Sequence, residues 1–249
     1  MNVRGDFLSA FPRHTRTASR AFQRRQPSMV AQHAGASPQW EGMWSRGLGK
    51  AQAFDVGAPS AALQAELARM PTPPPGSSAF VPGCGRAYDA LALARHGYDS
   101  VLAVDLAPTA VARAKEELAS SNDPAAAKVT IECGDFFEGT AGRFDFIWDC
   151  TFLCALDPSV RTRWAAQHKE LLTPTGELLT CVFPICDKVG GPPYALSVPL
   201  VTELLSPLGF KATRTHECTE GELHNPGGAA SLAGPGTTLV AWQLAPSAG

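Results

Sequence analysis

Residues 78–89 read Ser-Ala-Phe-Val-Pro-Gly-Cys-Gly-Arg-Ala-Tyr-Asp, and this stretch decides the fold. The apolar run up to Pro82 predicts a buried strand, the glycines predict a tight turn, and the apolar spacing over 90–96 predicts a helix. Gly83 and Gly85 have no Cβ, so the backbone can take positive φ and come close to a ligand. Free N–H groups at the following helix N-terminus would meet the polar atoms of that ligand.

A second sequence signal for a cofactor site follows the glycine turn at the expected distance. Gly97 ends the predicted helix, residues 100–104 predict a buried strand, and Asp105 closes that strand about 20 positions after Gly83. Strand-to-helix turns also collect glycines for packing reasons alone, but a carboxylate at this spacing is the residue that binds a ribose diol. The two signals together predict a nucleoside-containing cofactor, and they leave NAD and S-adenosylmethionine both open.

Composition limits the class of protein. The chain has 249 residues, 45% hydrophobic and 18% charged, with a formal net charge of −2. This predicts one soluble α/β domain with a sizeable core, and it gives no electrostatic reason to bind nucleic acid or an acidic polymer. No apolar run reaches the roughly 18 to 20 residues that span a bilayer, so we expect no membrane segment. We also expect a monomer.

The seven cysteines form no C-x-x-C pair, and most lie in apolar runs. Buried, reduced thiols in a reducing compartment are the expectation for that pattern, rather than a disulfide framework. The six histidines show no ligand spacing either, so the sequence predicts no metal site.

Residues 1–36 differ in composition from the rest of the chain. They hold six arginines against one acid, Asp6, with interspersed serine and threonine. This composition is typical of a transit peptide for a chloroplast or mitochondrion. A solvated, disordered basic tail is the alternative, and translation from Met29 would give a cytoplasmic protein. The domain proper is expected at 37–249.

Three aromatic residues precede the domain core. Trp40 and Trp44 are four positions apart, so they share one face of a helix, and Phe54 follows them. Such a face usually packs on the core. The alternative is an aromatic lid over a cationic cofactor, because a sulfonium would gain cation–π attraction from an indole ring.

Further apolar runs predict strands at 129–133, 144–149 and 178–183, with a turn at Pro174–Gly176 before the last of them. Pro108 predicts the start of a helix. Asp135 and Phe136 follow the first run and could hold an adenine, one by a hydrogen bond and the other by stacking. Asp149 closes the second run and needs a partner, which leaves a structural N–H contact and a ligand contact both open.

The end of the chain predicts a different kind of strand pairing. The runs 210–215 and 238–244 have no helix between them, so they predict an antiparallel pair at the end of an otherwise parallel sheet. A Gly/Pro-rich loop, 221–236, separates them. His168 lies on the apolar face of a predicted helix and is expected to be a core histidine.

Taken together, these motifs resemble a known family, the thiol and halide methyltransferases of plants and algae within the thiopurine methyltransferase superfamily. The resemblance runs from about Trp40 to Phe210. It is carried by Trp40-x-x-x-Trp44, Phe54-Asp55-x-Gly57, Phe80 to Gly85, Asp105, Gly134 to Phe137, Phe144 to Asp149, and Asp187 to Tyr194.

This resemblance implies an α/β fold, a single Rossmann-like class I methyltransferase domain with a seven-stranded, mostly parallel sheet and S-adenosylmethionine at its carboxyl edge. The donor-binding residues that it implies are Trp40 and Trp44 at the methionine end, Phe54, Gly83 beneath the donor, Asp105 on the ribose, Asp135 and Phe136 on the adenine, and Asp149.

The chain departs from the family pattern at three positions. Phe54 stands where a tryptophan is common, and Cys150 and Phe183 stand where the family often has tyrosines near the transferred methyl group. With Tyr194 these last two are expected to line the substrate pocket. The 221–236 loop has no counterpart in the pattern.

The sequence therefore predicts methyl transfer from S-adenosylmethionine to a small thiol, bisulfide, thiocyanate or halide. An anionic nucleophile carries no proton, so no general base is required, and the sequence shows no His/Asp or Cys/His arrangement. One alternative is a nicotinamide-dependent oxidoreductase, although Tyr88 stands where its fingerprint needs a third small residue. The other is a catalytically silent cofactor-binding module.

Overall fold

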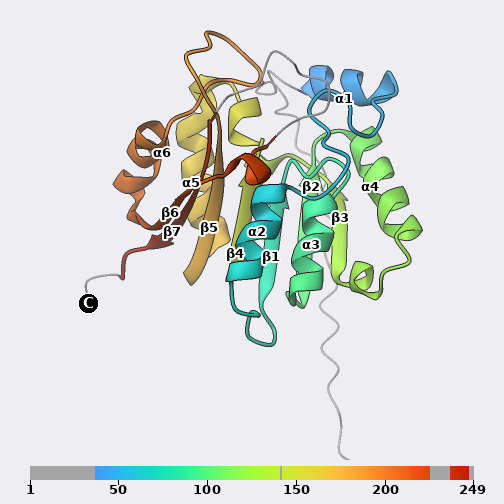
Figure 1. Cartoon of the computed structure of the whole chain (residues 1–249), viewed down its shortest axis with the longest axis horizontal. Coiled ribbons are helices and arrows are strands. Elements are labelled where there is room, and N and C mark those ends of the chain that lie inside the picture. Colours follow the sequence, from blue (N-terminus) through green and yellow to red (C-terminus); the bar gives the residue numbers. More distant parts are fainter. Residues whose placement is uncertain (1–36, 141, 225–235, 247–249) are drawn as a thin grey trace, which may run out of the picture. The chain divides into compact units, whose positions relative to one another are not determined.

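The computed structural model describes residues 37–140, 142–224 and 236–246, and these residues form one seven-stranded sheet with helices on both faces (Figure 1). The strand order is β3-β2-β1-β4-β5-β7-β6. β3, β2, β1, β4 and β5 are mutually parallel, while β7 pairs antiparallel with both β5 and β6. The predicted α/β fold is thus confirmed. The expected transit peptide, 1–36, and most of the 221–236 loop lie outside the described residues.

The strands are β1 (Ser78–Pro82), β2 (Ser100–Asp105), β3 (Val129–Cys133), β4 (Phe144–Cys150), β5 (Leu172–Ile185), β6 (Phe210–Glu217) and β7 (Gly236–Leu244). The α-helices are α1 (Ser37–Ser45), α2 (Ala61–Arg69), α3 (Tyr88–His96), α4 (Pro108–Ser120), α5 (Arg161–Leu171) and α6 (Val198–Leu205).

Alternating residues of the strands supply two separate cores, because successive side chains of a strand point to opposite faces of the sheet. In β1, Ala79 and Val81 pack with α2, α3 and α4, whereas Phe80 packs on the other side with α5 and α6. Figure 1 shows α2 and α3 over one face of the sheet. The fully buried Trp148 and Trp164 belong to these two cores respectively.

The start of β5 differs from the prediction. The sequence suggests a turn at Pro174–Gly176, but the strand already begins at Leu172, which pairs with Phe144. The next register pair joins Phe146 to Glu177, so the turn residues form an irregularity within the strand. A Cβ on Gly176 would lie 2.9 Å from the Phe144 carbonyl oxygen, which explains the glycine at this position.

Parallel strands bring their carboxyl ends to one edge of the sheet, and this edge positions the site. Pro82 of β1 pairs with Val104 of β2, so the glycine turn and Asp105 emerge side by side. Cys150 ends β4 beside Cys181 of β5. Residues far apart in the chain thus meet at one edge.

Candidate active site

A cavity of about 500 Å³ opens at this edge of the sheet. Its lining comes from the glycine turn, from the segment around α1, and from the ends of β4 and β5. It brings together most of the residues that the sequence predicts for a site, namely Trp40, Trp44, Phe54, Gly83, Asp105, Cys150 and Phe183.

The glycine turn and Asp105 are joined directly. Gly83 and Gly85 have φ of 58° and 52°, the left-handed region that their lack of a side chain permits. The Gly85 N–H donates to Asp105 Oδ2 at 2.9 Å, and the Ala107 N–H donates to Oδ1 at 2.9 Å. Burial raises the pKa of Asp105 above its ordinary value, although these backbone donors oppose that shift. The carboxylate is therefore fixed in orientation at the cavity wall.

Three aromatic rings form one cluster over this turn. The ring centroid of Phe54 lies 5.7 Å from those of both Trp40 and Trp44, in edge-to-face geometry. Trp44 is 4% exposed and all three rings line the cavity. The packing interpretation of these aromatics is thus confirmed, and their role as a lid over a cationic cofactor stays a prediction for rings that also line the cavity.

A buried ion pair, which sequence spacing did not reveal, fastens this aromatic segment to the turn. Arg86 Nε lies 2.8 Å from Asp55 Oδ2, and Arg86 Nη2 donates to the Leu48 carbonyl at 2.7 Å. The guanidinium also lies over the Trp44 ring, 5.5 Å from its centroid. Arg86 belongs to the glycine-turn motif and Asp55 to the Phe54-Asp55-x-Gly57 motif. They are 31 positions apart, so no local sequence pattern predicts that they pair.

Asp89 links three further elements at the cavity wall. Its Oδ1 accepts the Ser60 N–H at 2.7 Å, just before α2, and its Oδ2 accepts the Trp148 Nε1–H at 2.7 Å. Burial raises its pKa. Asp89 therefore holds α3, α2 and β4 in register around the cavity.

The far end of the cavity is lined by Cys150, Phe183 and a residue that the sequence analysis missed, His224. His224 Nδ1 lies 4.0 Å from Cys150 Sγ, and its ring centroid lies 4.9 Å from that of Phe183. The statement that the chain holds no Cys/His arrangement was therefore wrong. The two residues are 74 positions apart, and His224 stands at the start of a loop that matched no pattern.

Asp149 and His168 meet inside the protein rather than at the cavity. Asp149 is 2% exposed and accepts hydrogen bonds from Trp164 Nε1 at 2.7 Å and from the Leu153 N–H at 3.2 Å. His168 Nε2 lies 3.2 Å from the same carboxylate. Of the two alternatives for Asp149, a structural N–H contact or a ligand contact, the structure shows the first. His168 is a core histidine, as expected.

Three other predicted residues do not line the cavity. Phe136 is 4% exposed, and its ring lies 5.0 Å from the ring of Phe152 in the second core. Asp135 Oδ1 accepts the Phe137 N–H at 2.8 Å. Tyr194 donates its N–H to the Cys154 carbonyl at 2.7 Å, while Pro192 and Pro193 of its loop reach the lining. Adenine binding by Asp135 and Phe136 stays a prediction.

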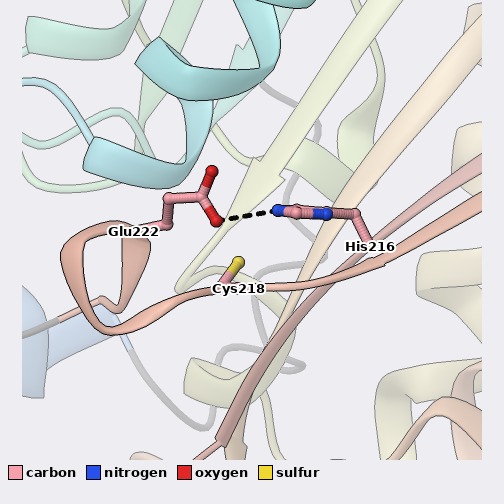
Figure 2. Close-up of side chains that lie close together, drawn as sticks. All are labelled: His216, Cys218 and Glu222. Carbon is pink, nitrogen blue, oxygen red and sulfur yellow. Dashed lines mark hydrogen bonds and ion pairs between the residues drawn. The ribbon is translucent and has the colours of Figure 1, made fainter.

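A compact group of three polar side chains follows from the end of β6, although the sequence spacing predicted no such cluster. Its members are His216, Cys218 and Glu222. Figure 2 shows the Glu222 carboxylate directed at His216, whose Nε2 lies 2.8 Å from Oε2. Glu222 also accepts the Thr219 N–H at 2.9 Å and pairs with Arg69 of α2 at 3.0 Å. The Thr219 N–H, His216 and Arg69 lower the pKa of Glu222 to about 2. With its carboxylate so engaged, the group is a hydrogen-bonded clasp between β6 and α2.

Comparison with known proteins decides between the two cofactor classes. The family model of thiopurine S-methyltransferases matches residues 36–243. The chain belongs to the thiopurine S-methyltransferase family. It is therefore an S-adenosylmethionine-dependent methyltransferase, and the family resemblance seen in the motifs is confirmed.

Relatives in this family cover most of the chain. A probable thiol methyltransferase 2 from Arabidopsis thaliana is 41% identical over 177 residues, which are 70% of this chain and 74% of the relative. Thiocyanate methyltransferase 1 from Brassica oleracea is 37% identical over 72% of this chain and 76% of its own length.

Solved structures support the fold. The glycopeptide N-methyltransferase MtfA, complexed with S-adenosyl-L-methionine, matches with a TM-score of 0.59 at 16% identity, over 77% of this chain and 96% of that one. At this identity the match shows a shared fold alone. None of the helices in the described residues has the length and apolar character to cross a bilayer.

The charges of the cavity fit the family's sulfonium donor. Asp55, Asp89 and Asp105 line it, and Arg86, the one arginine or lysine among the described lining residues, is already paired with Asp55. Carboxylates and aromatic rings favour a cation, whereas the pyrophosphate of NAD would find no free positive charge. Asp105 with the glycine turn would hold the nucleoside, and the Trp44 side would face the sulfonium.

Proposed function

We propose that the chain transfers the methyl group of S-adenosylmethionine to a small sulfur nucleophile, with an alkyl thiol, bisulfide or thiocyanate as the substrate class. The observation that carries this proposal is the lining of the far end of the cavity. Cys150 and Phe183 present a polarisable sulfur and an apolar ring where a nucleophile would lie. Such a surface suits a soft sulfur atom better than a hard, strongly hydrated anion.

S-adenosylmethionine supplies the methyl group as an electrophile on a positively charged sulfur. The chain's own contribution is alignment and removal of water, since the two reactants must meet in line and the nucleophile must lose its hydration shell. Trp44, Phe54 and Phe183 line the cavity and would exclude water from both reactants. Asp105 would orient the nucleoside from a fixed position.

The names of the relatives support sulfur as the acceptor atom, because they include thiol and thiocyanate methyltransferases. Halide, the other nucleophile class in our sequence analysis, is proposed only as a poor alternative substrate. We also propose that the enzyme works as a monomer. The arginine-rich start of the chain supports delivery to a chloroplast or mitochondrion.

The test is a comparison of kcat/KM values in the purified protein with S-adenosylmethionine as donor. The substrates are bisulfide, an alkyl thiol, thiocyanate, iodide and chloride, at one pH and with S-adenosylhomocysteine as the common product measured. We expect the thiols to exceed iodide, and iodide to exceed chloride. Turnover of chloride as fast as that of bisulfide would contradict the proposed substrate class.

A further inference from the structure

His224 carries a buried nitrogen that the fold leaves without a partner. The residue is 7% exposed and lines the cavity, and its Nδ1 faces Cys150 Sγ at 4.0 Å. Its Nε2 is buried, and no hydrogen-bond partner for it lies in the part of the chain that the structure describes. A buried polar atom without a partner is costly, so its presence beside a cavity indicates a ligand that completes it.

The position of His224 is built into the fold. Two residues earlier, Glu222 is held by Arg69 of α2 at 3.0 Å and by His216 of β6 at 2.8 Å (Figure 2). Thr219 and Glu222 add a reciprocal capping box to the intervening turn. This clasp fixes the chain just before His224, so the imidazole at the far end of the cavity lies on an anchored segment.

The ionisable side chain that lies within hydrogen-bond distance of His224 in the described residues is the thiol of Cys150, and two further thiols interact with Cys150. Cys150 ends β4, Cys181 lies beside it on β5, and Cys218 follows β6. A hydrogen bond with Cys181, together with burial, raises the pKa of Cys150 well above its ordinary value, and burial raises that of Cys218 to about 11. Cys150 and Cys218 therefore keep their protons near neutral pH, whereas the imidazole of His224 offers a buried nitrogen without a partner among the described residues.

We propose that His224 is a catalytic residue that accepts the proton of a thiol substrate at Nε2 while Cys150 holds Nδ1. This role of His224 rests on the proposed function. It narrows the substrate class to nucleophiles that carry an S–H bond when they bind. In the step, the S–H bond breaks and its proton bonds to Nε2. The sulfur electron pair forms the new S–CH₃ bond, and the donor C–S bond breaks with its electron pair left on S-adenosylhomocysteine. The histidinium then returns its proton to water.

This role separates two kinds of substrate that the cavity could hold. An alkyl thiol is mostly protonated at pH 7, since an ordinary thiol has a pKa of about 8.5. Thiocyanate and iodide are anions without a proton to lose. Only the thiol requires His224 as a base. When one His224 variant is tested on both kinds of substrate, the activity on thiocyanate or iodide is therefore the internal control.

The experiment compares His224→Gln with the parent protein at pH 7, using 2-mercaptoethanol and thiocyanate as acceptors. Gln keeps a hydrogen-bonding group but cannot take a proton. General-base catalysis contributes on the order of 10² to 10⁴ in rate, so we expect kcat/KM for the thiol to fall at least about 100-fold. For thiocyanate we expect a change below about threefold. His96→Gln, on the surface at the end of α3, is the matched control and should change neither value.

Two further measurements keep the proposal falsifiable. The loss in His224→Gln should shrink as the pH rises toward the thiol's own pKa, because thiolate then forms without a base. In the parent complex with S-adenosylhomocysteine, the ¹⁵N signal of His224 Nε2 should shift when 2-mercaptoethanol is added, since the S–H group becomes its partner. If the Gln variant melts lower than the control, the same substrate ratio is measured in His224→Asn.

An equal loss on thiol and thiocyanate, or no loss on either, would overturn the role of His224. A missing shift of the Nε2 signal would also overturn it. Failure of the proposed function itself looks different, because the parent protein would then methylate neither acceptor.

Discussion

The guanidinium of Arg86 and the carboxylate of Asp55 form a buried ion pair, with Nε 2.8 Å from Oδ2 and with 8% and 3% of the two side chains exposed. Arg86 belongs to the glycine turn, and Asp55 belongs to the segment that carries Phe54. The pair therefore joins the two parts of the donor site, which come from different stretches of the chain. This contact therefore holds the glycine turn and the aromatic segment together at the cavity.

Breaking this pair should damage both stability and donor binding. Arg86→Met leaves the buried Asp55 carboxylate without its counter-charge and with only the Gly57 and Ala51 N–H groups as partners, and breaking a buried ion pair typically costs about 3 to 5 kcal/mol of folding free energy. Urea denaturation measures this loss, and titration with S-adenosylhomocysteine should show weaker binding. Arg95→Met is the control, because Arg95 is 50% exposed in its pair with Asp123 and such pairs contribute under about 1 kcal/mol. Equal effects of the two variants would mean that Arg86 does not lock the site.

The sequence was sufficient for the parts of the fold that depend on local pattern. The apolar runs, the turn at Gly83 and the proline that begins α4 each predict an element from a few neighbouring residues, and the structure contains each of them. The false turn at Pro174–Gly176 shows the limit. Proline and glycine there signal a break, but pairing with β4 absorbs these residues into a strand irregularity.

The site was predictable where a motif marks it. Asp105 and Trp44 stand at recognisable spacings, so both were found. His224 and the Arg86–Asp55 pair depend on contacts between residues 31 to 74 positions apart, which no single-chain pattern encodes. Phe136 shows what position leaves undetermined, because an aromatic at a strand end can turn into the core, as Phe136 does, and its contact with adenine stays a prediction.

Asp105→Asn should weaken binding of S-adenosylhomocysteine at least tenfold. Charge-assisted hydrogen bonds contribute about 1.5 to 3 kcal/mol, and Asn replaces one acceptor oxygen by a donor. Asn is preferable to Ala, since Asn keeps one of the two acceptor oxygens that the Gly85 and Ala107 N–H groups use, whereas Ala removes both. Calorimetric titration measures the affinity, with the exposed Asp99→Asn as control and NADH as a ligand that neither protein should bind. An unchanged affinity would remove Asp105 from the donor site.

The clasp at Glu222 should give the protein a specific response to acid. Its partners lower the pKa of Glu222 from 4.5 to about 2. The stability that the clasp contributes is therefore fully present above about pH 4.5 and is lost as the pH falls toward 2. The melting temperature of Glu222→Gln should lie below that of the parent at pH 6, and the difference should shrink between pH 4.5 and 2.

The control for the clasp is Glu217→Gln, on the exposed side of β6. It should melt close to the parent at pH 6. A difference between parent and Glu222→Gln that is the same at pH 6 and pH 2 would show that the clasp does not depend on the Glu222 charge.

Hydrogen-bond donors at the far end of the cavity should set the choice between sulfur and halide. Cys150 offers only a weak S–H donor and Phe183 offers none, so a small hard anion loses its water without replacement. Cys150→Tyr combined with Phe183→Tyr should raise the ratio of chloride to thiol kcat/KM. Competition between the two acceptors in one reaction measures this ratio directly, and a double variant with the parent ratio would refute this account of selectivity.

We propose that this chain moves a methyl group from S-adenosylmethionine to sulfur. The most direct test supplies S-adenosylmethionine with a ¹³CD₃ methyl group to the purified chain together with 2-mercaptoethanol, and identifies the products by mass spectrometry. We predict the labelled methyl thioether and S-adenosylhomocysteine in equal amounts, with at least about tenfold less thioether from Asp105→Asn at low donor concentration. Intact donor after many expected turnovers, or donor consumed without a label on sulfur, would contradict the account.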